Sequence, residues 1–179
     1  MGTGDSTRVD WFSQKMRTKI RYGCDRDANY VKNIDLKSYP YPWTKDEWRQ
    51  ALGEDGCKWC VFLLEAQPIG FGVWKEHDET SDIEILRLCI KPTERRAGYG
   101  TRLLAWIEEE SKKIGFGGAY MVIPEINCFP GHPDDVSEWL RLQGYAAETP
   151  ILKDYRRMYG SLVDGFRFAK VIGGAPIDE

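Results

Sequence analysis

Residues 88–104, LCIKPTERRAGYGTRLL, are the most informative part of the sequence. They begin as an apolar strand, pass through a loop with two arginines and two glycines, and end in an amphipathic helix. Glycine allows a close approach to the backbone that a Cβ would block, and the amides of a turn and of a helix N-terminus bind phosphate oxygens. No Gly-Lys-Ser/Thr follows, and the glycine spacing differs from that of a dinucleotide fingerprint. The stretch therefore predicts an anion site between a strand and a helix. It is neither the phosphate loop of nucleotidases, which needs Gly-Lys-Ser/Thr, nor a dinucleotide fingerprint.

The segments on either side predict a mixed sheet flanked by helices. Strands are expected at Thr18–Tyr22, Lys58–Glu65, Ile69–Lys75, Asp82–Ile90, Ala119–Ile123, Tyr145–Leu152 and Phe166–Ile172. Helices are expected at Asp27–Leu36, from Thr44 to near Gly53, from after Gly100 to near Lys113, and from a cap at Asp134 to Leu142. A strand–helix–strand unit joins parallel strands, so the strand after the third helix is expected beside the strand before it. The predicted fold class is α+β, with a mixed, mostly antiparallel sheet of about seven strands.

Two helix ends carry specific signals. Thr44 and Glu47 have the spacing of a capping box at the start of the second helix, and Trp43 and Trp48 occupy the positions of a hydrophobic staple. Gly144 follows the last predicted helix at the position that favours a left-handed backbone. Both signals predict where these helices begin or end.

Length and composition favour one globular domain. The 179 residues are 42% hydrophobic and 13% aromatic, which supplies enough apolar surface for a core. The domain is expected at residues 17–172, between a flexible N-terminal extension, residues 1–16, and a flexible tail, residues 173–179. The formal net charge of −3 argues against a nucleic-acid partner, which needs a basic surface. No run approaches the ~18 apolar residues of a membrane helix and no leader is evident, so a cytoplasmic monomer or homodimer without a membrane partner is expected.

The cysteines raise the question of a metal site. Cys57 and Cys60 have the spacing of metal ligands, and Cys128 with His132 would complete a set of four. The first pair enters an apolar strand, however, and no second compact pair exists. Reduced thiols and no metal cofactor are therefore expected.

The basic loop resembles a known motif. Residues 95–100, Arg-Arg-Ala-Gly-Tyr-Gly, are similar to the pyrophosphate-binding motif of the GNAT superfamily of N-acetyltransferases, Gln/Arg-x-x-Gly-x-Gly/Ala. The resemblance covers roughly Lys19 to Ile172 in length and element order, and it implies the fold of that superfamily with acetyl-coenzyme A as cosubstrate. It further implies transfer of the acetyl group to a primary amine by direct attack in a ternary complex. The residues implied in binding acetyl-coenzyme A are Leu88, Cys89 and Ile90 through their backbone, the loop residues Arg95, Arg96, Ala97, Gly98, Tyr99, Gly100 and Thr101, and Asn127.

Glu84 is the candidate for the general base. It is the one polar residue on the strand face of Glu84, Leu86, Leu88 and Ile90 if the alternation runs unbroken, whereas a bulge would change the face. Partial burial disfavours a charged carboxylate, which suits a group that must take a proton from an ammonium substrate. Glu84 also lies fourteen residues before Gly98, where the histone-acetylating branch of the superfamily carries its catalytic glutamate. The alternative is a half-exposed strand carboxylate without a catalytic role.

The departing thiolate must gain a proton, and two tyrosines are candidates for the general acid. Tyr155 and Tyr159 lie near the C-terminal strands, and we assign the role to Tyr155. A packing role for either tyrosine is the alternative.

The acceptor is left open by the sequence. Residues 41–44, Tyr-Pro-Trp-Thr, resemble the Phe-Pro-Trp-Thr/Ser segment that borders the peptide site of the bacterial ribosomal-protein alanine N-acetyltransferases. Two positions depart from those enzymes, because Leu140 stands where they carry a tyrosine general acid and Val122 where they carry a glutamate. A protein N-terminus, a lysine or a small cationic amine would each fit as the acceptor. The alternative of another class is a coenzyme A-binding module that regulates or assembles without catalysis.

Overall fold

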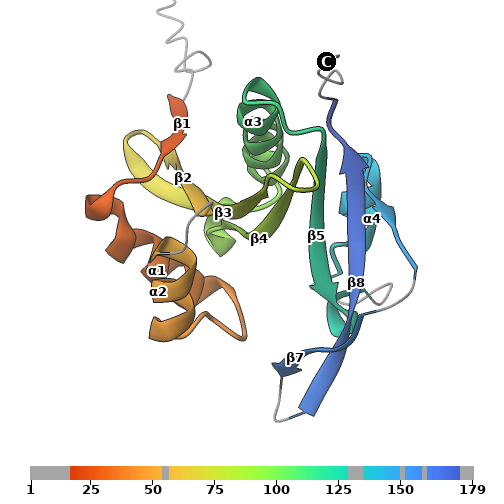
Figure 1. The fold of residues 1–179 in the computed structure, drawn as a ribbon. Coiled ribbons are helices and arrows are strands. Elements are labelled where there is room, and N and C mark those ends of the chain that lie inside the picture. The colour runs from red at the N-terminus through yellow and green to blue at the C-terminus, as the bar shows by residue number, and fades with distance from the viewer. Residues whose placement is uncertain (1–16, 54–56, 129–134, 150–151, 159–160, 174–179) are drawn as a thin grey trace, which may run out of the picture.

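The computed structural model describes residues 17–53, 57–128, 135–149, 152–158 and 161–173. Within them the chain forms an eight-stranded sheet and four α-helices (Figure 1). The strands are β1 (Thr18–Tyr22), β2 (Cys57–Leu64), β3 (Gln67–His77), β4 (Asp82–Ile90), β5 (Gly118–Pro124), β6 (Ala146–Ala147), β7 (Leu152–Met158) and β8 (Ser161–Val171). The helices are α1 (Ala28–Ser38), α2 (Lys45–Gly53), α3 (Tyr99–Lys113) and α4 (Ser137–Leu142). The predicted α+β class and mostly antiparallel sheet are confirmed, with eight strands in place of about seven.

The sheet opens in its middle. Its strand order is β1-β2-β3-β4-β5-β8-β6, and β7 pairs with β8. β4 and β5 pair in parallel, as predicted for strands joined by a helix, but only over Asp82–Glu84 against Gly118–Tyr120. Beyond these three positions the two strands diverge (Figure 1). The backbone groups of their facing edges are thereby left without a ladder, although every other neighbouring pair in the sheet is antiparallel and hydrogen-bonded.

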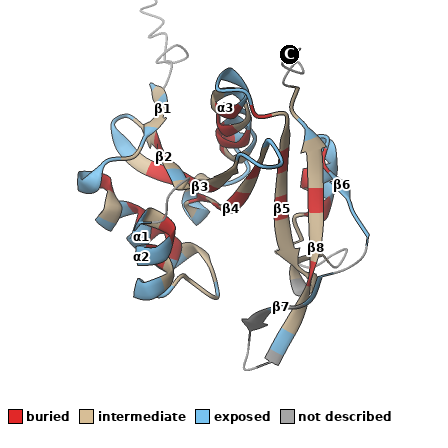
Figure 2. Ribbon diagram, viewed as in Figure 1, coloured by how far each residue is buried: buried red, intermediate tan, exposed pale blue. Residues whose placement is uncertain are grey.

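Helices cover the sheet on both faces. α1 and α2 place Val31, Ile34 and Trp48 against Phe71 and Val73 of β3. On the opposite face, α3 and α4 form a second core cluster with the sheet, whose members include Phe62, Leu103, Leu104, Ile107, Leu140 and Phe168. Figure 2 shows the buried residues concentrated where the helices meet the strands. The two layers fix the positions of the segments that border the opening.

The predicted helix-end signals are present. The Thr44 amide donates to Glu47 Oε2 over 2.7 Å, and the Glu47 amide donates to Thr44 Oγ1 over 3.2 Å. The rings of Trp43 and Trp48 meet edge to face with centroids 5.0 Å apart. Gly144 has φ +88°, in the left-handed region that favours glycine. The capping box, the staple and the glycine stop are all confirmed.

The C-terminal third departs from the prediction. The strand expected at Tyr145–Leu152 is wrong, because the chain forms the two-residue β6 and then the separate strand β7. The helix expected from Asp134 begins at Ser137, whose amide donates to Asp135 Oδ1 over 2.9 Å. Asp134 itself lies outside the described residues. Several short elements follow one another so closely here that the pattern of apolar residues cannot separate them.

A bulge breaks the face that was predicted for β4. Val73 pairs with Arg87 and Trp74 with Ile85, so Leu86 is an extra residue in β4. Leu86 consequently packs toward α1 and α2, whereas Leu88 and Ile90 pack toward α3. Since Ile83 and Ile85 also face α3, Glu84 lies on the same side as Leu86 and on the opposite side from Leu88.

No helix in the described part of the chain combines the length and apolar character that crossing a bilayer demands.

Candidate active site

A cleft of about 470 Å³ occupies the opening between β4 and β5. One wall is β4 from Ile85 to Ile90, and the opposite wall is β5 from Met121 to Pro124. The rest comes from four segments that are distant in sequence: residues 38–41 at the end of α1 and just beyond it, the basic loop with the start of α3, the chain around α4, and Tyr155 of β7. The cleft therefore lies where β4 and β5 no longer pair, and these four segments converge on it.

Most of the residues predicted to bind acetyl-coenzyme A meet in this cleft. Those that line it are Leu88, Cys89, Ile90, Arg95, Arg96, Gly98, Tyr99, Gly100, Thr101 and Asn127. Ala97 is not among the lining residues. Their binding roles stay predictions, but three separate segments of the chain bring them to one site.

The start of α3 has the properties of an anion site. Gly98 caps the helix at φ +78°, and within the described residues no side chain accepts a hydrogen bond from the first helical amides. The first amides of a helix have no partner within it, and they carry the positive end of the helix dipole. Arg96 also adopts a positive φ of 67°, and alternating left-handed residues form a concave array of amides. Unpaired amides beside two arginines fit a pyrophosphate group.

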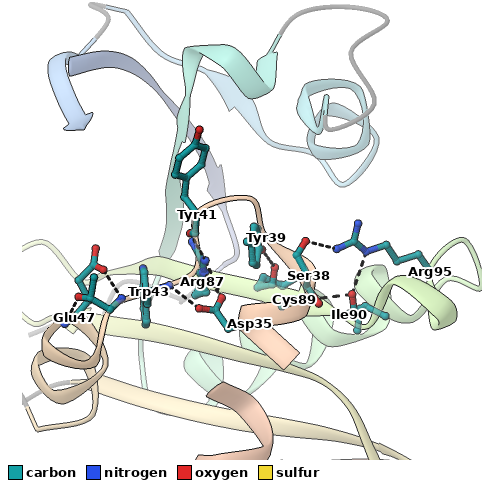
Figure 3. Close-up of polar contacts among 12 residues, drawn as sticks. Asp35, Ser38, Tyr39, Tyr41, Trp43, Glu47, Arg87, Cys89, Ile90 and Arg95 are labelled. Carbon is teal, nitrogen blue, oxygen red and sulfur yellow. Dashed lines mark hydrogen bonds and ion pairs between the residues drawn. The ribbon is translucent and has the colours of Figure 1, made fainter. Parts of the chain in front are cut away.

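Arg95 has a second role that the amino-acid sequence did not indicate. Its Nε donates to the Ile90 carbonyl over 3.1 Å, and its Nη2 donates to the Ser38 carbonyl over 3.0 Å. The side chain thus links the end of β4 to the end of α1 (Figure 3). It holds the basic loop in place in addition to contributing positive charge.

The 38–43 segment, residues Ser38 to Trp43, is attached along β4. The Tyr39 hydroxyl donates to the Leu88 carbonyl, and Arg87 Nη2 donates to the Tyr41 carbonyl over 3.0 Å. Burial raises the pKa of Tyr39 well above its ordinary value, so this hydroxyl keeps its proton and remains a donor. The first four residues of the segment, 38–41, form the side of the cleft nearest α1.

A buried ion pair lies beneath this segment. Arg87 of β4 and Asp35 of α1 are joined by contacts from Nε at 2.8 Å and Nη2 at 2.7 Å to Asp35 Oδ1. The side chains are 8% and 0% exposed. Asp35 Oδ2 accepts from the Trp43 amide over 2.7 Å, and the guanidinium carbon lies 3.7 Å from the centre of the Tyr39 ring. Sequence reasoning missed this pair, because its members are 52 positions apart and only the packing of α1 on the sheet brings them together.

Glu84 lies beside the cleft and not in its lining. Its Oε2 is 3.3 Å from His77 Nε2 and accepts from the Tyr120 hydroxyl over 3.3 Å. Burial, and then the charge of Glu84, raise the pKa of Tyr120 to about 12, so the phenol stays a donor. The neighbouring residues Ile85 and Leu86 do line the cleft, so Glu84 is next to its narrow end, where β4 and β5 still pair. Its role as base stays a prediction.

Other candidate residues have mixed outcomes. Tyr155 lines the cleft and is 40% exposed, whereas Tyr159 lies outside the described residues. His132, the fourth member of the hypothetical metal set, also lies outside them. In the described ranges no three His, Cys, Asp or Glu side chains gather as metal ligands would.

Comparisons with known proteins agree with this geometry. Residues 28–128 match the Acetyltransferase (GNAT) family, and no curated protein sequence matches the chain significantly. The ribosomal-protein-S18-alanine N-acetyltransferase of Escherichia coli is similar in structure, with a TM-score of 0.74 at 16% identity over 91% of this chain and 99% of that one. Arabidopsis thaliana NAA60, solved with a bisubstrate analogue, gives 0.71 at 15% identity over 89% and 100%. The spermidine/spermine N-acetyltransferase SpeG of Vibrio cholerae gives 0.66 at 15% over 87% and 92%.

Proposed function

Because the chain belongs to the acetyltransferase (GNAT) family, we propose that it transfers an acetyl group from acetyl-coenzyme A to a primary amine in the cleft between β4 and β5. Family membership confirms the enzyme class, an acetyl-coenzyme A-dependent N-acetyltransferase, and so favours catalysis over the non-catalytic alternative. The observation that carries the proposal is the convergence of unpaired α3 amides, two arginines and the open edge of β4 on one cleft.

In this proposal, different parts of the cleft bind different parts of the cosubstrate. The amides at the start of α3, with Arg96, would hold the pyrophosphate. The backbone of Leu88 to Ile90 would hold the arm of the cosubstrate, with an amide near Leu88 facing the oxygen on which negative charge develops. Acetyl-coenzyme A supplies a thioester, whose carbonyl carbon forms the new C–N bond as the C–S bond breaks. In this scheme Glu84 takes the proton of the amine, directly or through water, and Tyr155 returns one to the departing sulfur.

Direct attack by the amine is supported by the chemistry of Cys89, the one thiol in the described lining of the cleft. Burial raises the pKa of Cys89 to about 11, so the thiol is protonated at neutral pH, and the thiolate is the nucleophilic form. An acetyl-cysteine intermediate would need that thiolate.

We predict that Cys89→Ala keeps turnover within about threefold of the wild type, because only packing is lost. Intact-mass spectrometry after incubation with acetyl-coenzyme A and no amine is expected to show no acetylated enzyme. Cys60→Ala, which removes a buried thiol outside the cleft lining, is the matched control. Acetylated Cys89, or loss of turnover in Cys89→Ala but not Cys60→Ala, would argue for a covalent intermediate.

Binding of the cosubstrate is tested by thermal unfolding. At ~100 times the dissociation constant, acetyl-coenzyme A should stabilise the protein by about 2.7 kcal/mol, a rise of roughly 5 to 10 °C for a domain of this size. ATP and NAD serve as controls, since they carry phosphates without a thioester arm. No rise at saturating acetyl-coenzyme A would contradict the assignment of the cleft.

The amine of a protein N-terminus is the acceptor class that we propose first. The support is the Tyr-Pro-Trp-Thr segment at residues 41–44, whose first residue lines the cleft, together with a structural likeness to an enzyme that acetylates a ribosomal protein. Two positions depart from that resemblance: Leu140 is fully buried in the core, and Val122 in the cleft wall has no group to transfer a proton. Acetylation of peptides with free N-termini, measured by mass spectrometry against N-terminally blocked lysine peptides and spermidine, distinguishes the three acceptor classes. A preference for spermidine or lysine would replace this assignment without affecting the cosubstrate.

A further inference from the structure

We propose that the buried pair Asp35–Arg87 is a positioning device that fixes the 38–43 segment as the acceptor wall of the cleft. The inference rests on the proposed function, since it assigns an end of the same cleft to the amine. It gives Arg87 and Asp35 a role in acceptor binding through the segment that they hold, without contact to the reacting atoms.

The attachments run in order along β4. Ser38 is held near Ile90 by Arg95, Tyr39 binds Leu88, and Tyr41 is held by Arg87. The 38–43 segment therefore follows β4 in the opposite direction, from the anion loop toward the narrow end of the cleft. Its first residue is on the side of the pyrophosphate site and Tyr41 is on the side of acetyl transfer.

The pair controls the Tyr41 end of the segment from both sides. Asp35 accepts from the amide of Trp43, after Tyr41, and Arg87 donates to the carbonyl of Tyr41 itself. The guanidinium also lies over the Tyr39 ring at 3.7 Å and 5.3 Å from that of Trp43. Figure 3 shows the Tyr41 ring directed away from this network, and the ring belongs to a residue of the cleft lining.

The anion end has a separate attachment. Arg95 joins Ser38 to Ile90 without help from Asp35 or Arg87. The amides of α3 likewise make no contact with the pair in the described structure. Loss of the pair should consequently loosen the acceptor wall and leave the cosubstrate site intact, which is a separation that general damage to the fold would not produce.

The test is the double variant Asp35→Asn/Arg87→Met, which removes both charges together and leaves no uncompensated buried ion. Three quantities are measured: hydrogen exchange of the backbone amides of Tyr39, Tyr41 and Trp43, which are the residues of 39–43 that carry an amide hydrogen, the dissociation constant of acetyl-coenzyme A, and the KM of the acceptor. The acceptor probe is an alanine-initiated peptide or spermidine, whichever the wild type acetylates faster. We expect exchange and acceptor KM each to rise about tenfold, the effect of one lost hydrogen bond, with the cosubstrate constant changed less than about twofold.

Arg21→Met/Asp27→Asn is the matched control. This pair also ties down α1, with contacts of 2.6 and 2.9 Å at the opposite end of the helix, and neither member lines the cleft. It should leave the acceptor KM unchanged. Arg87→Lys keeps the positive charge but loses the planar guanidinium that donates to two partners. Its acceptor KM should therefore lie between that of the wild type and that of the double variant.

The proposal is overturned if acceptor and cosubstrate affinities weaken together, if exchange in residues 39–43 is unchanged, or if the control pair raises the acceptor KM equally. Failure of the wild type to acetylate either probe would count against the proposed function. In that event faster exchange with unchanged acetyl-coenzyme A affinity still supports the positioning device, and unchanged exchange overturns it.

Discussion

Arg87→Ala is expected to lower the free energy of unfolding by about 3 to 5 kcal/mol, because it leaves a buried charge without its partner. Asp35 is 0% exposed, and among the described residues its carboxylate would keep only the Trp43 amide as a donor. The Tyr39 ring would also lose the cation above it. For a domain of this size the change corresponds to a fall of roughly 6 to 20 °C in Tm, which calorimetry or denaturant unfolding measures.

Two variants separate the charge effect from lost packing. The double variant Asp35→Asn/Arg87→Met should recover more than half of the loss, since neutralising both members removes the uncompensated ion. Arg21→Ala should cost less than Arg87→Ala, because the Arg21 side chain is 34% exposed and water replaces part of its contact with Asp27. A loss below about 1 kcal/mol in Arg87→Ala would mean that Asp35 is far better solvated than its burial indicates.

Glu84→Gln is expected to lower kcat by about 100- to 10,000-fold with little change in acetyl-coenzyme A affinity, as loss of a general base does. Glutamine keeps the size of the side chain and an oxygen that accepts from Tyr120, so the contacts of the site survive. Steady-state kinetics and calorimetric binding of acetyl-coenzyme A give the two quantities.

Glu79→Gln is the control for this prediction. It removes a carboxylate from the exposed turn between β3 and β4, close in sequence but without a contact to Glu84, and should leave kcat unchanged. Equal losses of turnover and cosubstrate affinity in Glu84→Gln would indicate a structural role, and no loss of either would assign the base elsewhere.

Local signals in the sequence predicted most of the architecture. β1 and β4 have the predicted bounds, and the capping box at Thr44 and the glycine at Gly144 set helix ends as expected. These features depend on residues within one turn or one strand, so the pattern itself contains the information. The basic loop was found for the same reason, because its glycines and arginines adjoin the helix that they precede.

The parts that sequence reasoning missed depend on long-range packing. The bulge at Leu86 follows from the register between β3 and β4, which no alternation within β4 reveals, and it turns Glu84 to the face opposite Leu88. The partners of Glu84, His77 and Tyr120, come from β3 and β5. The pair Asp35–Arg87 is likewise invisible until α1 is placed on the sheet.

The divergence of β4 and β5 has a consequence for how this protein tolerates change. A ligand held by main-chain amides and carbonyls is recognised through the path of the chain and places few demands on side-chain identity. Substitutions that preserve the path of β4 and the left-handed turn at Gly98 should therefore leave the cosubstrate site usable. Changes in sequence can then alter the proposed acceptor side, where the Tyr41 side chain lines the cleft, independently of the part proposed to bind the shared cosubstrate.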